Sequence, residues 1–151
     1  MDNTCDICTY PRKPEDLLLE TPHWWVNVGN NSAYFGRAFV TLKQHKGSLS
    51  ELTPEEWQEF EEIVSKVEHA YGKAWGAKPL NWSCFMNNAF RTDPGNPHVH
   101  WHVLPRYRTA PVVDGVMYED TEFGEHYLVG KVREVSPEVT ATIIKKLKEY
   151  I

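Results

Sequence analysis

The feature that most constrains the fold is a run of three histidines that alternate with apolar residues: His98, Val99, His100, Trp101, His102 and Val103. Strict alternation of polar and apolar residues has the period of a half-buried β-strand. Because alternate side chains of a strand share one face, we expect the three imidazoles to line one face, roughly 7 Å between neighbours. The apolar partners would then face a core, whereas a helix would spread the imidazoles apart.

Imidazoles in a row support two kinds of chemistry. Histidine is the commonest metal ligand near neutral pH, and a neutral imidazole also serves as a nucleophile or an acid–base group. A nucleophilic histidine needs one ring nitrogen held by a hydrogen bond and the other aimed at the substrate. The middle residue, His100, suits that role best because its neighbours restrict it on both sides. Crowded imidazoles also disfavour each other's protonation, which favours a neutral His100.

Three other segments are rich in β-forming residues and are predicted as strands: residues 24–28, 35–45 and 79–87. The apolar run at 17–19 fits either the start of a strand or a turn of helix. Glycine, proline and acidic residues dominate 109–130, which predicts a long irregular segment or lid.

Two helices are indicated by their start signals. Thr53, Pro54 and Glu56 form a capping box with proline in the first turn, and apolar residues then recur at spacings of three and four to about Trp75. Ser136 is the expected cap of a C-terminal helix. The predicted fold class is therefore α+β, an antiparallel sheet of about five strands with one long helix and a C-terminal helix.

Length and composition exclude several classes of protein. A chain of 151 residues with 41% hydrophobic residues fits a single globular domain over 1–151. The net charge of −5 argues against a broad nucleic-acid surface but leaves room for a small nucleotide. Apolar runs stay well below the ~20 residues of a membrane helix. The first residues lack the basic and apolar regions of a secretion signal, so we expect a cytoplasmic protein with no membrane partner.

Cysteines give a weaker signal. Their number, three, and the expected compartment argue against a disulfide framework. Cys5 and Cys8 form a Cys-x-x-Cys pair, which can supply half of the ligands of a tetrahedral zinc ion. By itself the pair fits a redox couple or two incidental thiols equally, although no βαβ pattern surrounds it as in thioredoxin-like proteins.

The triad and the Pro105-Arg106 that follow it resemble the signature of the histidine triad (HIT) family, His-x-His-x-His-x-x with x apolar. That family consists of nucleotide hydrolases and transferases that act on α-phosphates. The resemblance implies that His100 becomes transiently nucleotidylated, that His102 contacts phosphate oxygens, and that His98 holds structure or orients its neighbours.

The segment from Gly36 to His45 is also similar to a HIT pattern, Gly-His-x-Leu-Val-x-Pro-Lys-x-His, but Arg37 and Leu42 replace the usual histidine and proline. Zinc-bearing relatives use a Cys-x-x-Cys, a histidine after this strand and the first triad histidine. The resemblance therefore implies a structural zinc site with four ligands: Cys5, Cys8, His45 and His98. The alternative is that His45 is merely exposed beside two lysines.

Substrate contacts rest on three asparagines. The family places a phosphate-contacting amide near the position of Asn87, eleven residues before His98, although Asn87 also fits a turn. Asn27 is a candidate for ribose contact. The family's usual polar residues before the triad are missing here, so Asn96 is the candidate replacement. Arg106 fits a cation that steers an anionic substrate.

Together these features predict a HIT-like core over about 5–108 with an extension over 109–151. The predicted activity is cleavage at the α-phosphate of a purine nucleotide conjugate, either a dinucleoside polyphosphate or a nucleoside phosphoramidate, with sugar nucleotides also open. A homodimer is implied by the resemblance. Two alternatives remain: a metal-dependent hydrolase that uses the triad as ligands, and a nucleotide-binding protein without catalysis.

Overall fold

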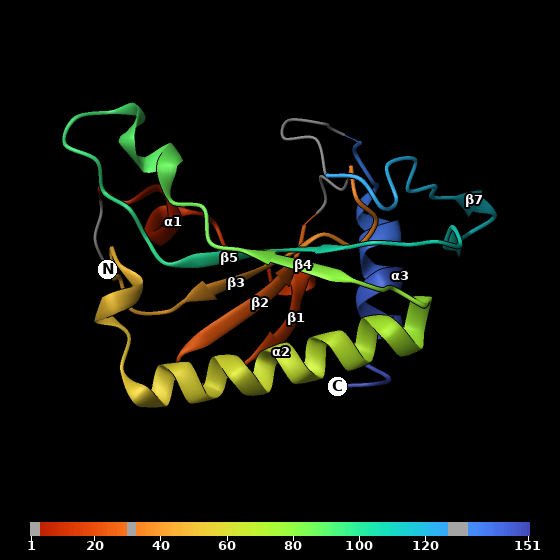
Figure 1. The fold of residues 1–151 in the computed structure, drawn as a ribbon, viewed down its shortest axis with the longest axis horizontal. Helices are drawn as coiled ribbons and strands as arrows, with labels where there is room; N and C mark the ends of the chain where they lie inside the picture. Colours follow the sequence, from red (N-terminus) through yellow and green to blue (C-terminus); the bar gives the residue numbers. More distant parts are fainter. Residues whose placement is uncertain (1–3, 30–32, 127–132) are drawn as a thin grey trace.

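One antiparallel sheet carries a long helix across one face and a second helix at its end (Figure 1). These features come from a computed structural model, which describes residues 4–29, 33–126 and 133–151. Across the sheet the strands run β1 (Leu17–Glu20), β2 (Trp24–Val28), β3 (Ala38–Leu42), β5 (His100–Pro105) and β4 (Leu80–Ser83). The helices are α2 (Pro54–Trp75) and α3 (Pro137–Leu147). The predicted α+β architecture with five strands is confirmed, and residues 17–19 belong to a strand.

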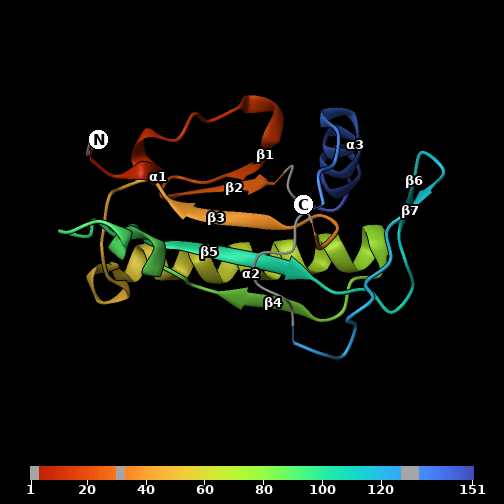
Figure 2. The same ribbon diagram turned by 90° about the horizontal axis from the view of Figure 1, so that it is seen from above.

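The strand β5, which contains His100 and His102, lies inside the sheet between β3 and β4 (Figure 2). Val40 of β3 pairs with Trp101, and Trp82 of β4 pairs with Val103. Directly paired residues of antiparallel strands share a face, so these side chains point together toward α2. On that side Trp101 stacks against Phe60 of α2 with ring centroids 4.7 Å apart. The polar residues that alternate with them in β5, His100 and His102, lie on the opposite face of the sheet.

The strand β5 begins at His100, so only two of the three histidines lie within it. His98 stands where the chain enters the sheet and is 1% exposed. Its neighbour Val99 donates to the carbonyl of Lys46 and accepts from Leu42 N. The prediction that all three histidines line one half-buried face is therefore right for His100 and His102, whereas His98 is buried by the loop that follows β3.

The helix α2 has the termini that its sequence predicts. Thr53 Oγ1 accepts from Glu56 N at 3.3 Å, and the Glu56 carboxylate accepts from Thr53 N at 2.7 Å. Glu56 is also buried against Lys46, with Nζ 2.6 Å from Oε2, which ties the loop after β3 to the start of the helix. Gly76 ends the helix in the left-handed conformation at φ 68°.

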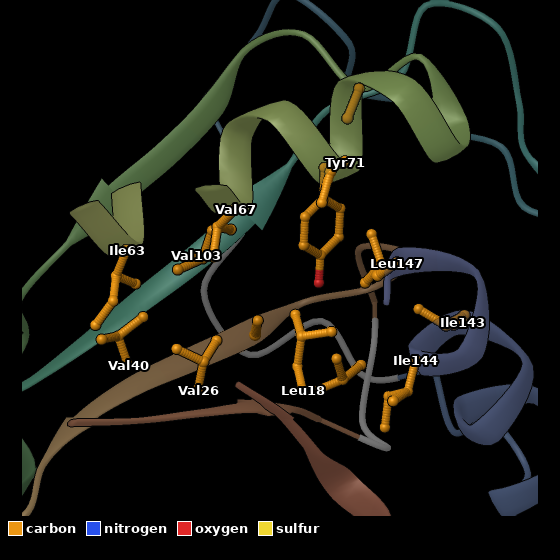
Figure 3. Close-up of a cluster of buried hydrophobic side chains, with 14 of the residues drawn as sticks. Leu18, Val26, Val40, Ile63, Val67, Tyr71, Val103, Ile143, Ile144 and Leu147 are labelled. Atoms are coloured by element: carbon orange, nitrogen blue, oxygen red, sulfur yellow. The ribbon is translucent and has the colours of Figure 1, made fainter. Parts of the chain in front are cut away.

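The core lies between the sheet, α2 and α3 (Figure 3). Val26, Val40 and Val103 project from the sheet toward Ile63 and Val67 of α2. A second part of the core is formed where α3 approaches β1, with these labelled members: Leu18, Ile143, Ile144 and Leu147. The cap of α3 is Ser136, whose Oγ accepts from Val139 N at 3.4 Å, as predicted.

The described part of the chain also contains short elements: α1 (Asp6–Thr9), 3₁₀ helices at Pro14–Asp16, Leu49–Glu51 and Asn87–Arg91, and the hairpin strands β6 (Val112–Val113) and β7 (Val116–Met117). The predicted strand over 79–87 is wrong beyond Ser83, because the chain leaves the sheet and turns at Asn87. The segment predicted as irregular over 109–130 contains this small hairpin, and its residues 127–130 lie outside the described part. None of the described helices is long and apolar enough to cross a membrane.

Candidate active site and metal site

Three distant segments bring four metal-ligating side chains together. Cys5 and Cys8 come from the N-terminal segment, His45 from the loop after β3, and His98 from the entrance to β5, with ligand atoms all within 4.8 Å of one another. The Nδ1 atoms of the two histidines are 3.3 Å apart, and Cys8 Sγ lies 3.5 Å from Nδ1 of His45 and 3.3 Å from that of His98. These residues are positioned to bind a metal ion. The alternative of an exposed His45 is wrong.

The rest of the His98 ring is arranged for the same role. Its Nε2 lies 2.8 Å from the carbonyl oxygen of Leu42, which can only accept, so Nε2 carries the proton and Nδ1 is left as a ligand. Burial lowers the pKa of His98, which favours the neutral ring that a metal requires. Burial also raises the pKa of the Cys5 thiol. A nearby cation would reverse that preference, since thiolates are the form that binds metals.

His100 is held by its own chain. Its Nδ1 lies 2.8 Å from the carbonyl oxygen of His98, so Nδ1 donates and the lone pair of the neutral ring is on Nε2. Burial lowers the pKa of His100, and the hydrogen bond to the carbonyl of His98 opposes that shift. The lowered pKa of His100 thus comes from burial and not from the expected crowding of the imidazoles. The ring is half-buried. A neutral imidazole with one nitrogen fixed and the other available has the form that a nucleophile needs.

His102 has a partner that the motif does not contain. Arg37 Nη2 lies 2.8 Å from His102 Nδ1, across the pairing of β3 with β5. Burial, followed by the charges of His100 and Arg37, lowers the pKa of His102 to about 4. Sequence reasoning noted Arg37 only as a departure from the HIT pattern. That departure was the signal available, but the contact depends on which strands are neighbours.

Asn27 lies on the same face of the sheet as His102. Asn27 pairs with Phe39 and Phe39 pairs with His102, so the three form a row across three strands. The spacing of strands puts Asn27 about 10 Å from His102 along this row. Ser83 of β4 continues the row on the other side of His102. Phe39 and Phe85 flank the His102 ring, with centroids 5.1 and 5.6 Å away.

The other two asparagines have different surroundings. Asn87 is exposed and starts a 3₁₀ helix, so its turn-forming interpretation describes the backbone correctly. Asn96 Nδ2 donates to Thr4 Oγ1 at 2.7 Å, which ties the loop before His98 to the N-terminal segment. The structure therefore brings Asn27 into the row with His102 but gives Asn96 a partner beside the metal ligands.

The charge of Arg106 is paired inside the protein. Its side chain is 3% exposed and forms a bidentate pair with Asp120, with Nε 2.7 Å from Oδ2 and Nη2 3.0 Å from Oδ1. It also donates to the carbonyls of Glu122 and Glu125. The interpretation of Arg106 as a steering cation is wrong, because burial and the carboxylate neutralise its charge. Arg106 instead anchors the segment from Asp120 to Glu125.

The residues from 11 to 109 match the HIT domain family. This span includes the triad, the Arg37–His102 contact and the loop with His45. The chain belongs to the HIT domain family. Two of the metal-positioned residues, Cys5 and Cys8, precede the matched span.

A curated relative is the adenosine 5'-monophosphoramidase hnt1 of Schizosaccharomyces pombe, 31% identical over 71 residues. The match covers 47% of this chain and 49% of hnt1, so the chain spans about half the length of the curated relative that it matches. The diadenosine triphosphate hydrolase of Plasmodium falciparum, solved with cyclomarin A, has a similar fold with a TM-score of 0.64 at 16% identity, covering 95% of this chain and 80% of that chain.

A zinc-bound HIT protein from Mycobacterium smegmatis gives a TM-score of 0.61 at 18% identity, covering 91% of this chain and 86% of that one. At these identities the solved structures establish the shared fold. They support the HIT-like α+β architecture independently of the sequence match.

Proposed function

We propose that this protein is a nucleotide hydrolase or transferase that cleaves at the α-phosphate of a nucleotide conjugate through a covalent intermediate on His100. The observation that carries the proposal is the hydrogen bond from His100 Nδ1 to the carbonyl of His98, which leaves the Nε2 lone pair for attack. The two relatives described above are named for adenosine compounds, so adenylylated phosphoramidates and dinucleoside polyphosphates are the substrates that we propose first.

The proposed reaction has two displacements at phosphorus. The Nε2 lone pair of His100 attacks the α-phosphorus, a phosphorus–nitrogen bond forms, and the bond to the leaving group breaks with its electron pair. Water, or another acceptor in a transfer reaction, then breaks the phosphorus–nitrogen bond and releases the mononucleotide. His102 donates to a phosphate oxygen as charge develops there. Asn27 and Asn87 are proposed substrate contacts. Asn27 lies two strands, about 10 Å, from His102, so it could contact the ribose of a nucleotide whose phosphate is bound at His102.

Zinc is the ion that we propose for Cys5, Cys8, His45 and His98. A tetrahedral zinc with ordinary bond lengths separates two nitrogen ligands by about 3.3 Å and a nitrogen from a sulfur by about 3.6 Å. The corresponding distances here are 3.3 Å between nitrogens and 3.3 to 3.6 Å between nitrogen and sulfur. Four protein ligands leave no open position, so the ion would supply a structural cross-link next to His100.

A metal-dependent hydrolase that uses the triad as ligands fits less well. Both nitrogens of His98 are engaged, one in the metal cluster and one with Leu42, and Nδ1 of His102 faces a guanidinium. The three rings therefore do not converge on one ion. A nucleotide-binding protein without catalysis is the outcome that an absence of turnover would favour. The homodimer and the cytoplasmic location stay predictions.

The test is turnover of a panel of adenylylated and guanylylated conjugates by wild type, His100→Ala and His69→Ala. His69 is exposed on α2 and serves as the matched histidine control. We expect His100→Ala to lose at least ~10³-fold in kcat/KM and His69→Ala to match wild type. A quenched reaction with a labelled substrate should place the label on His100. Full turnover by His100→Ala, or a label on another residue, would contradict the proposal.

A further inference from the structure

The contact between Arg37 and His102 joins two residues that are 65 positions apart in the sequence. Arg37 directly precedes β3, whose Phe39 pairs with His102. The guanidinium also lies over the Phe39 ring, with its central carbon 5.0 Å from the centroid. The contact therefore forms on the open face of the sheet, in the row that contains His102.

The backbone around Arg37 is held firmly. Gly36 takes φ 70°, and its carbonyl accepts from the buried Tyr71 hydroxyl at 2.6 Å. The preceding carbonyl, of Phe35, accepts from the buried Tyr107 hydroxyl at 3.1 Å. The carbonyl of Arg37 itself accepts from Gly29 N at 2.8 Å. The backbone position from which the Arg37 side chain extends is therefore fixed by three hydrogen bonds. They come from α2, from the chain after β5 and from the end of β2.

The direction of the hydrogen bond determines the proton position on His102. A guanidinium has donors only, so Nδ1 of His102 must accept. A neutral imidazole that accepts at Nδ1 carries its proton at Nε2. His102 is thereby kept as a donor at Nε2, which is the atom that can reach a phosphoryl oxygen. His100 has the opposite arrangement, with its proton on Nδ1.

The groups around His102 also favour its neutral form. Among the described residues, its ring contacts a cation, a second imidazole and two apolar rings: Arg37, His100, Phe39 and Phe85. Protonation of His102 would add a positive charge beside Arg37 within a half-buried site. An arginine keeps its charge across the pH range in which proteins stay folded, so its effect on His102 does not depend on pH.

We propose that Arg37 is a positioning residue that fixes the proton of His102 on Nε2, adds to the burial that keeps this ring neutral, and supplies the constant positive charge of the phosphate site. This inference rests on the proposed function for its catalytic consequence, since His102 is the proposed donor to phosphate. Activity should then persist at pH values where a histidine with its ordinary pKa would be charged.

The first test does not need a substrate. Nitrogen chemical shifts of the His102 ring, measured by NMR in the wild type, Arg37→Met and Arg37→Lys, report the tautomer and the pKa. We expect the wild-type ring to carry its proton on Nε2 and to stay neutral to pH 5. In Arg37→Met we expect a mixture of tautomers and a pKa that rises only in part, because burial and His100 still lower it. In Arg37→Lys, which keeps a donor and a charge, the neutral range should be partly restored.

The second test uses any conjugate that the wild type turns over. Arg37→Met should lower kcat about 10²-fold, change KM less, and move the acid limb of the pH profile to a higher pH than in the wild type. Arg108→Met is the control, because Arg108 is exposed and lies over Phe123 rather than a histidine. Thermal melting of each variant separates loss of folding from loss of positioning.

The two proposals fail in different ways. A wild-type His102 with its proton on Nδ1, or an Arg37→Met enzyme with the wild-type pH profile and kcat, would overturn the role of Arg37. An inactive wild type whose His102 is neutral and protonated at Nε2 would overturn the proposed function and leave the arrangement of Arg37 and His102 supported.

Discussion

The three histidines of the triad differ in the chemistry open to them, because each ring has a different hydrogen-bond partner. The carbonyl of Leu42 holds the proton of His98 on Nε2, the carbonyl of His98 holds that of His100 on Nδ1, and the Arg37 guanidinium leaves that of His102 on Nε2. Each partner acts on one ring nitrogen and therefore decides what the other can do. One ring is left as a metal ligand, one as a candidate nucleophile and one as a donor.

Gly36 offers a prediction at the scale of one residue. A Cβ at this position would lie 3.0 Å from the Tyr71 ring, and φ is 70°. We expect Gly36→Ala to lower the free energy of unfolding by about 1–2 kcal/mol from the backbone conformation alone, plus a cost for displacing Tyr71. Because Arg37 follows directly, activity should fall as well. Urea unfolding and turnover measure the two effects.

The control for Gly36 is Gly115, in the turn between β6 and β7. Its φ is 77°, and nothing lies within 4 Å of the Cβ position. Gly115→Ala should therefore show the backbone cost without the clash and without loss of activity. Equal effects of the two substitutions would mean that Tyr71 adjusts freely and that the contact has no consequence for the site.

At the scale of elements, the end of β5 is joined to the segment that follows it by one buried ion pair. Arg106 comes directly after β5, and its four hydrogen bonds reach Asp120, Glu122 and Glu125. The same carboxylate accepts from Tyr107 N at 3.2 Å. This arrangement holds a segment that lacks regular secondary structure against the edge of the sheet.

We expect Arg106→Met to lower the free energy of unfolding by about 3–5 kcal/mol, because Asp120 would be left buried without its partner. Limited proteolysis should then cut within 118–126 first. Arg108→Met, at an exposed position two residues later, should change stability by less than about 0.5 kcal/mol. If Arg106→Met and Arg108→Met were equally stable, the buried ion pair would make no net contribution to stability. The double variant Arg106→Met/Asp120→Leu would then be as stable as each of its two single variants.

At the scale of the whole molecule, the metal-positioned residues connect parts of the chain that the hydrophobic core does not. Cys5 and Cys8 lie outside the sheet, whereas His45 and His98 flank the paired strands β3 and β5. A bound ion would therefore tie the N-terminal segment to the entrance of β5. A ligand that binds only the folded state stabilises it by about 2.7 kcal/mol when its concentration is 100 times Kd.

Removing the metal with a chelator should accordingly lower Tm and expose the N-terminal segment to protease. Elemental analysis should give one ion per chain for the wild type and none for Cys8→Ser. Cys84→Ser is the matched control, since Cys84 lies outside the ligand group. A wild-type protein that holds no ion, or a chelated protein with unchanged Tm, would contradict the structural role.

The elements that depend on nearby residues could be predicted from the sequence alone. The capping box at Thr53, the helix end at Trp75, the strand at 24–28 and the alternation through β5 all depend on neighbours a few positions away. The end of β4 at Ser83 could not be predicted in this way, because the β-forming residues continue to Phe85 and only Asn87 favours a turn. The ligand set of the metal site was predicted only through resemblance to a family.

What only the tertiary structure decided is which side chains meet. Arg37 touches His102, Arg106 is neutralised by Asp120, and His98 is buried with its proton toward Leu42. Each contact depends on the order of strands in the sheet or on the path of a loop, and neither is encoded in the local period of hydrophobic residues. The sequence determined that histidines would line a strand, and it placed the carbonyl of His98 beside the ring of His100. The packing of β3 beside β5 brought up the partners, Leu42 and Arg37, that decide which nitrogen carries the proton in His98 and His102.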